Sequence, residues 1–363
     1  VRMGGTTTRR PTYGRAVVIV VVSLFVTMGG IVLTRGYWSR TYLGWSAIVW
    51  LFGSLMLRFA LRRRKWAERV VVVTDDEKLV ADLSQSEHIV IVQVLDPAGH
   101  RPNGADSSST LALDARASLS DEMAQFVTKW SLSGSPVRSL GSVYEQHLGR
   151  IALVHIAHGW ELTAPVDRNE YEPLKRFIDL VLVVVTAAFW LLLAGPIWVA
   201  IRLSSPGAAI YAQSRVGRHG KPFILYKFRT MVSNAEEDGP QFASPSDPRL
   251  TRVGRVLRRF RIDEIPQLWC VLKGDLSLIG PRPERPFFAK QFEHDIPFFA
   301  YRTLVRPGVT GWAQVNYGYA DDVADTVEKL TFDLYYVKHM SIWLDMQILG
   351  KSVWTVMSGF GAQ

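Results

Sequence analysis

The sequence has a single cysteine, Cys270, among its 363 residues. One cysteine cannot form an internal disulfide or a cysteine-based zinc site, so both are excluded, and Cys270 is expected to be a small buried apolar residue. Acidic residues are also few. The 33 Asp and Glu against 42 Lys and Arg leave a net charge of +9. This excess of positive charge is compatible with nucleic acid, anionic lipid or a phosphorylated substrate as the partner.

The sequence shows no internal repeat or low-complexity tract. Two segments near the N-terminus contain no charged residue. Residues 16–34 and 41–57 are charge-free and about as long as a bilayer span. Their outer flanks carry far more positive charge than the link between them, and positive charge collects on the cytoplasmic side. The pattern predicts a transmembrane helical hairpin within residues 1–67, with both ends in the cytoplasm. The alternative for the first segment is a cleaved signal peptide, but no small-residue cleavage site follows it.

Residues 173–203 form a third apolar segment of bilayer length, with positive charge at both ends. Such flanks argue against a simple crossing. Gly195 and Pro196 lie inside the segment, and a proline in mid-helix costs about 3 kcal/mol. These features favour a re-entrant helix that breaks at Gly195 and Pro196 and returns to the same leaflet. A kinked helix that spans the bilayer is the alternative.

Residues 68–165 predict a cytoplasmic α/β domain. Two apolar runs, 69–76 and 88–96, are typical of buried parallel strands, and 121–132 is typical of a helix of the same domain. A dinucleotide-binding fold needs a glycine-rich turn after its first strand, but this chain has Thr74, Asp75 and Asp76 there. We therefore expect a degenerate Rossmann-like domain that binds no dinucleotide.

Two adjacent carboxylates, Asp263 and Glu264, follow a run of four arginines: Arg255, Arg258, Arg259 and Arg261. Pro266 is tolerated in the first turn of a helix, which predicts a helix that begins at about Asp263 or Glu264. The helix dipole keeps a carboxylate ionised there and attracts phosphate to the same place. Asp263 is thus a candidate nucleophile toward phosphorus, with helix capping as the alternative role of the pair.

Further basic residues stand on tight, proline- or glycine-rich segments. Lys227 and Arg229 end a predicted strand at 222–228, Arg282 lies in "LIGPRPE" and Arg306 in "VRPGVTGWAQVN". A guanidinium on a stiff loop suits a phosphate group. The alternative is that these side chains reach toward lipid headgroups.

Residues 171–361 resemble the bacterial sugar transferase family, the monotopic phosphoglycosyl transferases that act on polyprenyl phosphate. The resemblance is carried by ordered motifs: "KRFIDL", "SPG", "QSRVGRHGKPFILYKFRTM", "DPRLTRVGRVLRRFRIDEIPQLW", "LKGDLSLIGPRPE", "RPGVTGWAQVN" and "FDLYYVKHMSIWLD". It implies a mixed α/β catalytic domain over residues 171–363, with a re-entrant helix and interfacial helices. The chain departs from the family in two ways. It has two N-terminal spans where long members have four or more. It also has Gly195-Pro196 where the re-entrant helix of the family commonly has Ser-Pro.

The resemblance also implies a reaction. Asp263 would attack the β-phosphorus of a UDP-sugar, expel UMP and carry a covalent sugar phosphate, which undecaprenyl phosphate then accepts. Glu264 would help to bind Mg²⁺, with Asp263, or would manage the acceptor's protons. Lys227, Arg229, Arg282 and Arg306 are the candidates for holding phosphates, and Arg261 is a further one.

The resemblance places the enzyme in the bacterial inner membrane with its catalytic domain on the cytoplasmic face, in contact with the membrane lipids. The expected donor is UDP-glucose or UDP-galactose, in the first step of exopolysaccharide, capsule or O-antigen synthesis. A UDP-N-acetylamino sugar is the alternative donor, and a homo-oligomer stays open.

Other functions remain to be weighed against this one. An ordinary glycosyltransferase would release UDP, and a non-catalytic scaffold of polysaccharide assembly would tolerate Asp263→Asn. A nucleic-acid binder is disfavoured because the arginines do not interleave with exposed aromatic residues.

The C-terminal segment 332–357 has the composition of an interfacial helix pair, with packing against the core as the alternative. Its aromatic residues are Tyr335, Tyr336, Trp343 and Trp354. His339 has no second histidine at ligand spacing and is expected to be structural.

Overall fold

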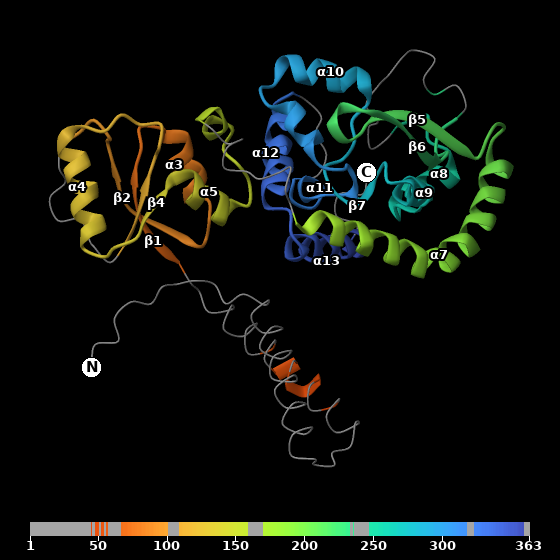
Figure 1. Cartoon of the computed structure of the whole chain (residues 1–363). Helices are drawn as coiled ribbons and strands as arrows, with labels where there is room; N and C mark the ends of the chain where they lie inside the picture. The colour runs from red at the N-terminus through yellow and green to blue at the C-terminus, as the bar shows by residue number, and fades with distance from the viewer. Residues whose placement is uncertain are drawn as a thin grey trace. The chain divides into compact units, whose positions relative to one another are not determined.

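A computed structural model describes residues 67–100, 109–158, 170–232, 235, 247–317 and 323–358, and scattered positions between 45 and 56. The chain divides into two compact units after Val143. The first predicted span, 16–34, lies outside the described residues. The described positions of the second predicted span, such as Trp45 and Phe52, are helical and have exposed side chains (Figure 1).

The first unit contains a four-stranded parallel sheet in the order β2-β1-β3-β4. Both predicted strands and the predicted helix are confirmed, and α4 and α3 cover opposite faces of the sheet (Figure 1). Met123, Phe126 and Trp130 of α4 pack against the strands. The elements are β1 (Glu68–Val73), α3 (Glu77–Ser84), β2 (Ile89–Leu95), β3 (Thr110–Leu113), α4 (Asp121–Leu132) and β4 (Val137–Ser139).

The turn after β1 is built from charged side chains. Asp76 caps α3 by accepting a hydrogen bond from Leu79 N (3.2 Å). Arg116 Nη2 lies 3.1 Å from Asp76 and 2.7 Å from Asp114, and Thr74 also donates to Asp114. Burial alone would raise the pKa of Asp114, but the hydrogen bonds from Arg116 and Thr74 outweigh it and lower that pKa to about 2. Carboxylates therefore occupy the edge of the sheet where a Rossmann fold places a pyrophosphate.

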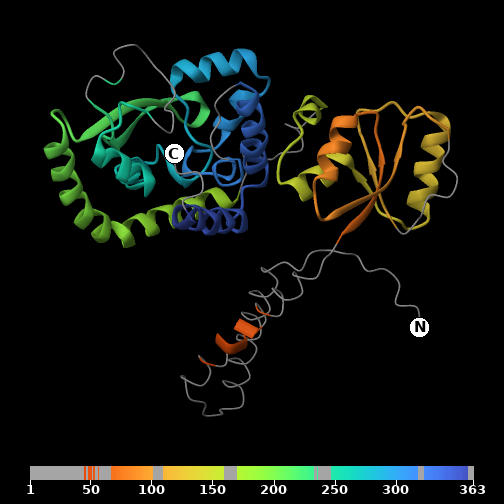
Figure 2. The same ribbon diagram turned by 180° about the vertical axis from the view of Figure 1, so that it is seen from behind.

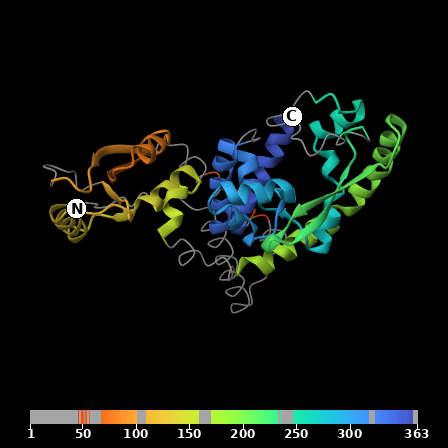
Figure 3. The ribbon, with the colours of Figure 1, turned by 90° about the horizontal axis from the view of Figure 1, so that it is seen from above.

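The second unit begins before the predicted boundary at residue 165, because Ile151 and Ile156 belong to its main core. It contains a two-stranded antiparallel sheet, β5–β6, and a two-stranded parallel sheet, β7–β8 (Figure 3). Helix α5 (Leu140–Leu148) lies at the boundary. The further elements are η1 (Leu153–His158), α7 (Tyr171–Ser204), β5 (Ile210–Val216), η3 (Arg218–Gly220), β6 (Pro222–Phe228), α8 (Arg252–Arg259), η4 (Ile262–Glu264), α9 (Gln267–Lys273), β7 (Ser277–Ile279), α10 (Pro286–Asp295), η5 (Phe299–Leu304), β8 (Gly308–Thr310), α11 (Trp312–Asn316), α12 (Val323–His339) and α13 (Ile342–Ser358).

Helix α7 is the one helix of the described residues that is long and apolar enough to cross a membrane. It continues through Gly195 and Pro196, so the expected break is not an interruption of the helix. A proline removes one backbone hydrogen bond, and here the turns on either side stay helical. The helix follows a curve along the edge of the second unit (Figures 1 and 2).

Both ends of α7 pack against the same unit. Near its start, Lys175 Nζ lies 2.7 Å from the buried Asp345 carboxylate of α13. Near its end, Ile201 is buried against Phe228 and Leu257. The middle of the helix is almost unburied, and only 11% of its most apolar 18-residue stretch is buried.

The C-terminal helices α12 and α13 pack in part against the core and in part expose an aromatic side chain. Tyr336 of α12 and Ile348 of α13 are fully buried in the main core, whereas Trp354 is 71% exposed. His339 Nε2 lies 2.8 Å from Glu145 and so has a structural partner. Cys270 is fully buried in an apolar cluster, as expected.

Candidate active site

A sharp turn between two helices places the acid pair. Helix α8 ends at Arg259, and Arg261 adopts a left-handed conformation with φ of 56°, which no helix can continue. Asp263 and Glu264 follow in a short 3-10 turn, and α9 begins only at Gln267. The predicted start of the α-helix at Asp263 or Glu264 was therefore too early, because Pro266 occupies the N-cap and not the first turn. Both carboxylates turn inward and are less than a tenth exposed.

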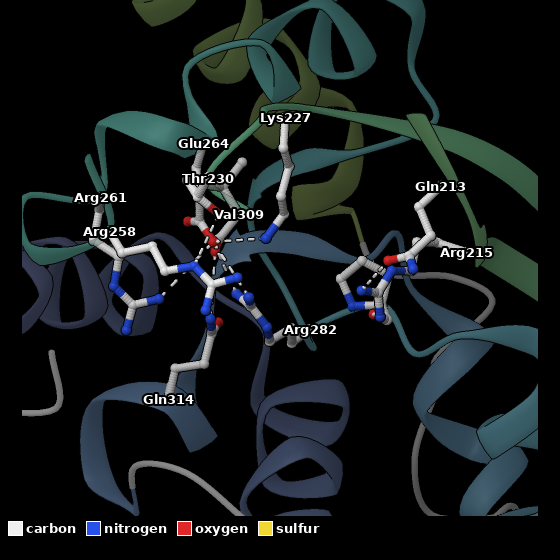
Figure 4. Close-up of polar contacts among 11 residues, drawn as sticks. Gln213, Arg215, Lys227, Thr230, Arg258, Arg261, Glu264, Arg282, Val309 and Gln314 are labelled. Carbon is white, nitrogen blue, oxygen red and sulfur yellow. Dashed lines mark hydrogen bonds and ion pairs between the residues drawn. The ribbon is translucent and has the colours of Figure 1, made fainter. Parts of the chain in front are cut away.

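Cationic side chains surround Glu264. Its Oε1 lies 3.3 Å from Lys227 Nζ, and 3.2 and 3.3 Å from the two terminal nitrogens of Arg282 (Figure 4). Arg261 Nη1 lies 3.9 Å away. Burial alone would raise the pKa of Glu264, but these three cations outweigh it and lower that pKa to about 2. Glu264 is therefore a permanent anion that holds the cations together.

Asp263 has the opposite character. Among the described residues no donor makes a hydrogen bond to its carboxylate, and its surroundings act on it through burial and charge. Burial raises its pKa above the ordinary value, Lys227 opposes this, and the neighbouring Glu264 adds to it. An ionised carboxylate with few hydrogen bonds is a stronger nucleophile than one that is fully bonded. The geometry thus leaves Asp263 available for chemistry.

Two residues that sequence reasoning passed over complete the surroundings of Asp263. Arg258 lowers the pKa of Asp263 by its charge, and its Nε donates to Thr230 Oγ1 (3.0 Å) (Figure 4). Helix α8 can approach Thr230 because Gly254 faces it, where a Cβ would lie 2.0 Å from Thr230 O. Arg258 belongs to the arginine run, so its place shortly before the acid pair in the sequence was the available signal.

The structure brings together only some of the predicted phosphate-binding residues. Lys227, Arg261 and Arg282 converge on Glu264 (Figure 4). Arg229 instead donates to the carbonyls of Ser205 and Pro206, at the end of α7.

Arg306 and the predicted break also lie apart from the acid pair. Arg306 Nε donates to Gly274 O, and its Nη1 lies 2.9 Å from Glu172. Gly195 and Pro196 lie inside α7, as described above.

A divalent cation fits this site only in part. No group of three or more His, Cys, Asp or Glu side chains gathers within the described residues as a ready metal centre. Glu264 is engaged by its cations, so Asp263 is the carboxylate that can offer an oxygen. Mg²⁺ commonly takes one or two carboxylates and completes its shell with water and substrate phosphates. The donor set therefore suits Mg²⁺ bound together with a phosphorylated substrate.

The arrangement as a whole suits an anionic phosphorus centre. Lys227, Arg258 and Arg282 place positive charge where a phosphate would approach Asp263. Fixed cations in a partly buried site stabilise developing negative charge more strongly than water does. A nucleophilic carboxylate beside them can attack phosphorus without further activation by a base.

Comparison with known proteins gives a consistent result. Residues 170–359 match the family model described as "Bacterial sugar transferase". The chain is 43% identical over 245 residues to the UDP-N-acetylgalactosamine-undecaprenyl-phosphate N-acetylgalactosaminephosphotransferase of Aeromonas hydrophila, a match that covers 68% of this chain and 58% of that protein.

The names of two further relatives specify other sugars. One is the UDP-glucose:undecaprenyl-phosphate glucose-1-phosphate transferase of Escherichia coli strain K12, 40% identical over 195 residues, which cover 52% of this chain and 40% of that protein. The other is the undecaprenyl-phosphate galactose phosphotransferase of Salmonella typhimurium, 36% identical over 216 residues, with 54% and 44% covered. The chain spans about half the length of these three relatives.

Proposed function

Because the chain belongs to the bacterial sugar transferase family, we propose that it transfers a sugar 1-phosphate from a UDP-sugar to undecaprenyl phosphate and releases UMP. The observation that carries the proposal is the contrast within the acid pair. Glu264 is committed to three cations, whereas Asp263, beside the same cations, accepts no hydrogen bond from the described residues. This is the arrangement that a carboxylate nucleophile toward a diphosphate requires.

In the first step Asp263 attacks the donor. One carboxylate oxygen forms a bond to the β-phosphorus, the bond from that phosphorus to the bridging oxygen breaks, and UMP leaves with the bonding electrons. Lys227 and Arg282, which pair with the neighbouring Glu264, would neutralise charge on the phosphoryl oxygens as this happens. The sugar phosphate is then esterified to Asp263.

In the second step a phosphate oxygen of undecaprenyl phosphate attacks the same phosphorus. The bond to Asp263 breaks, the carboxylate is restored, and undecaprenyl-diphospho-sugar is formed. One phosphoanhydride is made for each one broken, so the reaction needs no other energy source. Glu264, whose pKa is lowered to about 2, stays ionised and keeps its cations in place, which makes it a poor store of protons.

Mg²⁺ fits as a cofactor of this reaction. Asp263 would offer it one oxygen, and the diphosphate of the donor would supply others. When bound, the ion neutralises diphosphate charge and strengthens UMP as a leaving group.

Helix α7 gives the reaction its place at the membrane. A straight helix of 34 residues would extend about 51 Å at 1.5 Å per residue, more than a bilayer core. Yet Lys175 near its start and Ile201 near its end pack on the same unit, which cannot lie on both sides of a membrane. These contacts support a helix that enters the cytoplasmic leaflet of the inner membrane and returns. Asp263 would then face both the lipid-borne acceptor and the aqueous donor.

The names of the relatives bear on which sugar the enzyme transfers. The match to the N-acetylgalactosamine enzyme is longer and more identical than the matches to the glucose and galactose enzymes. This favours UDP-N-acetylgalactosamine over the UDP-glucose or UDP-galactose that the resemblance alone suggested. The lipid-linked product would begin an exopolysaccharide, capsule or O-antigen unit.

The test is to offer the purified enzyme undecaprenyl phosphate, Mg²⁺ and each UDP-sugar in turn, and to measure the nucleotide released. UMP is expected, with the highest rate from UDP-N-acetylgalactosamine. Donor labelled in the β-phosphate should also label the enzyme at Asp263 when the lipid is left out. Release of UDP, or an enzyme that never carries label, would contradict the proposal.

A further inference from the structure

The loop that carries Arg282 to the acid pair is held at every peptide. It runs from Pro281 to Glu284, between β7 and α10. Its two outer carbonyls accept backbone hydrogen bonds. Gly308 N donates to Pro281 O and Val216 N donates to Glu284 O, each at 2.9 Å. These donors belong to β8 and β5, so two separate strands fix the ends of the loop.

The two inner carbonyls are held by arginine side chains. Arg302 Nη2 donates to Arg282 O at 2.8 Å. Arg215, whose side chain is seen in Figure 4, donates from Nη1 to Pro283 O at 3.1 Å. All four successive carbonyls of the loop thus have donors, which come from three places in the chain: the end of β5, η5 and β8. So many restraints on four residues fix the direction in which Arg282 leaves the backbone.

The loop is also confined sterically. Prolines at 281 and 283 fix their own φ angles, and a residue before proline is restricted as well. The backbone of Gly308 lies so close to the start of the loop that a Cβ there would be 2.1 Å from Gly280 N. The restraint on Arg282 is therefore built into the sequence of the loop and its neighbour.

Arg302, which holds the carbonyl of Arg282, is itself held by buried acids. Its Nη2 lies 2.6 Å from Asp333 of α12, and its Nη1 lies 3.3 Å from Glu284. Lys329 shares Glu284 at 3.5 Å. Arg302 is 6% exposed and Asp333 is 2% exposed, so the pair is shielded from water. A buried guanidinium held between two carboxylates has fewer available geometries than an exposed one.

We propose that the Arg302–Asp333 ion pair is a positioning device for Arg282, and that its function in this chain is to hold that guanidinium against Glu264 beside Asp263. The path runs from Asp333 to Arg302, then to the carbonyl of Arg282, and from the Arg282 side chain to Glu264. The proposal rests on the proposed function, because Arg282 matters to catalysis only if Asp263 reacts with a phosphate. Arg302 and Asp333 touch no reacting atom and are positioning residues.

The alternative role of this ion pair is to stabilise the fold and nothing more. A double-mutant cycle separates the two roles. The effects of two substitutions add when the residues act independently and do not add when the residues are coupled. Asp333→Asn keeps the shape of the side chain but removes its charge. If the pair acts through Arg282, this change should lower kcat about 10- to 100-fold, since small misplacements of catalytic groups have effects of this size. In an Arg282→Ala background it should lower kcat less than about twofold.

Glu145→Gln is the matched control. Glu145 is a buried carboxylate of the same unit that pairs with Lys338 and His339, on the same helix as Asp333. It makes no contact with the loop among the contacts described, so its change should leave kcat within about twofold in either background. Thermal unfolding of each variant reports how much of any loss is a loss of fold.

A second measurement does not depend on turnover. Hydrogen exchange of the full-length protein in detergent, followed on peptides that cover residues 277–285, reports the mobility of the loop. Asp333→Asn should speed exchange in these peptides and Glu145→Gln should not.

Each outcome decides the question. Faster exchange together with a non-additive loss of kcat supports the proposal. Unchanged exchange, or a loss of kcat that is as large in the Arg282→Ala background, overturns it. If the wild-type protein releases no UMP from any UDP-sugar, the proposed function fails, and the exchange of the loop alone then decides whether the ion pair positions Arg282.

Discussion

Asp263 and Glu264 are adjacent in the chain and both buried, yet their pKa values move in opposite directions. Burial raises the pKa of Asp263, and the cations nearby only partly oppose it. Lys227 and Arg282, together with Arg261, lie within hydrogen-bond or ion-pair distance of Glu264 and lower its pKa to about 2. Two neighbouring carboxylates whose pKa values are shifted in opposite directions can take different roles in one reaction.

Asp263→Asn is expected to abolish transfer without unfolding the protein. An amide cannot form the phosphoryl ester, so kcat should fall on the order of 10⁴-fold or more. The UMP-release assay measures the loss, and thermal unfolding checks the fold. A variant that keeps substantial UMP release would show that Asp263 is not the nucleophile of the transfer.

The acid limb of the pH–rate profile should lie above the ordinary range of an aspartate. Only ionised Asp263 attacks phosphorus, and burial raises its pKa, so turnover should be lost as the pH falls through that raised value. Lys227 lowers the pKa of Asp263 by its charge, so Lys227→Gln should move the acid limb to higher pH. Measuring kcat against pH for both proteins checks the shift. An acid limb that moves to lower pH would contradict the assignment.

Glu264→Gln is expected to destabilise the protein, most strongly at neutral pH. The folded pKa of about 2 lies below the ordinary 4.5, so ionised Glu264 stabilises the folded state above pH 4.5. That stabilisation disappears as the pH falls toward 2. The shift corresponds to roughly 3 kcal/mol of unfolding free energy at neutral pH. Thermal unfolding of both proteins across this range should show curves that converge at acid pH, and a constant difference would refute the linkage.

Lys227 and Arg229 show where sequence reasoning stops. Both end a predicted strand, and both were predicted to hold phosphate. The predicted strand is confirmed, but β6 ends at Phe228, and the backbone of Arg229 bonds to Ala209. The Arg229 side chain donates to the carbonyls of Ser205 and Pro206 at the end of α7, and such a long-range contact is hard to read from one sequence. The acid pair and Arg282 could be found because each lies in a short, unusual motif.

The buried network around Arg302 could not be found in that way. Glu284, Arg302 and Asp333 lie in different segments, and each alone is an ordinary charged residue. Their pairing depends on how η5 and α12 pack, which is a long-range property of the fold. The predicted α/β architecture and the long apolar helix were accessible because they depend on local periodicity.

Arg229→Gln and Lys227→Gln should therefore behave differently. The buried Arg229 donates to the carbonyls of Ser205 and Pro206, so its loss removes these charge-assisted hydrogen bonds and should reduce stability by about 1–3 kcal/mol. The KM for the donor should stay nearly unchanged. Lys227→Gln removes a cation from the acid pair and should lower kcat/KM. Steady-state kinetics and thermal unfolding of both variants check the contrast. A large rise of KM in Arg229→Gln would place that residue at the donor instead.

The last prediction concerns α7, whose two ends pack on one unit. Leu174 is 49% exposed near its start and Leu203 is 82% exposed near its end, so cysteines at both positions should react with reagents. Cys270 is fully buried and gives little background. In inverted inner-membrane vesicles, a membrane-impermeant maleimide should label Leu174→Cys and Leu203→Cys equally, because both ends lie on the cytoplasmic side. In intact spheroplasts neither should be labelled. Labelling of the two sites from opposite sides would mean that α7 crosses the bilayer, and the acid pair could then not be held at the cytoplasmic surface as proposed.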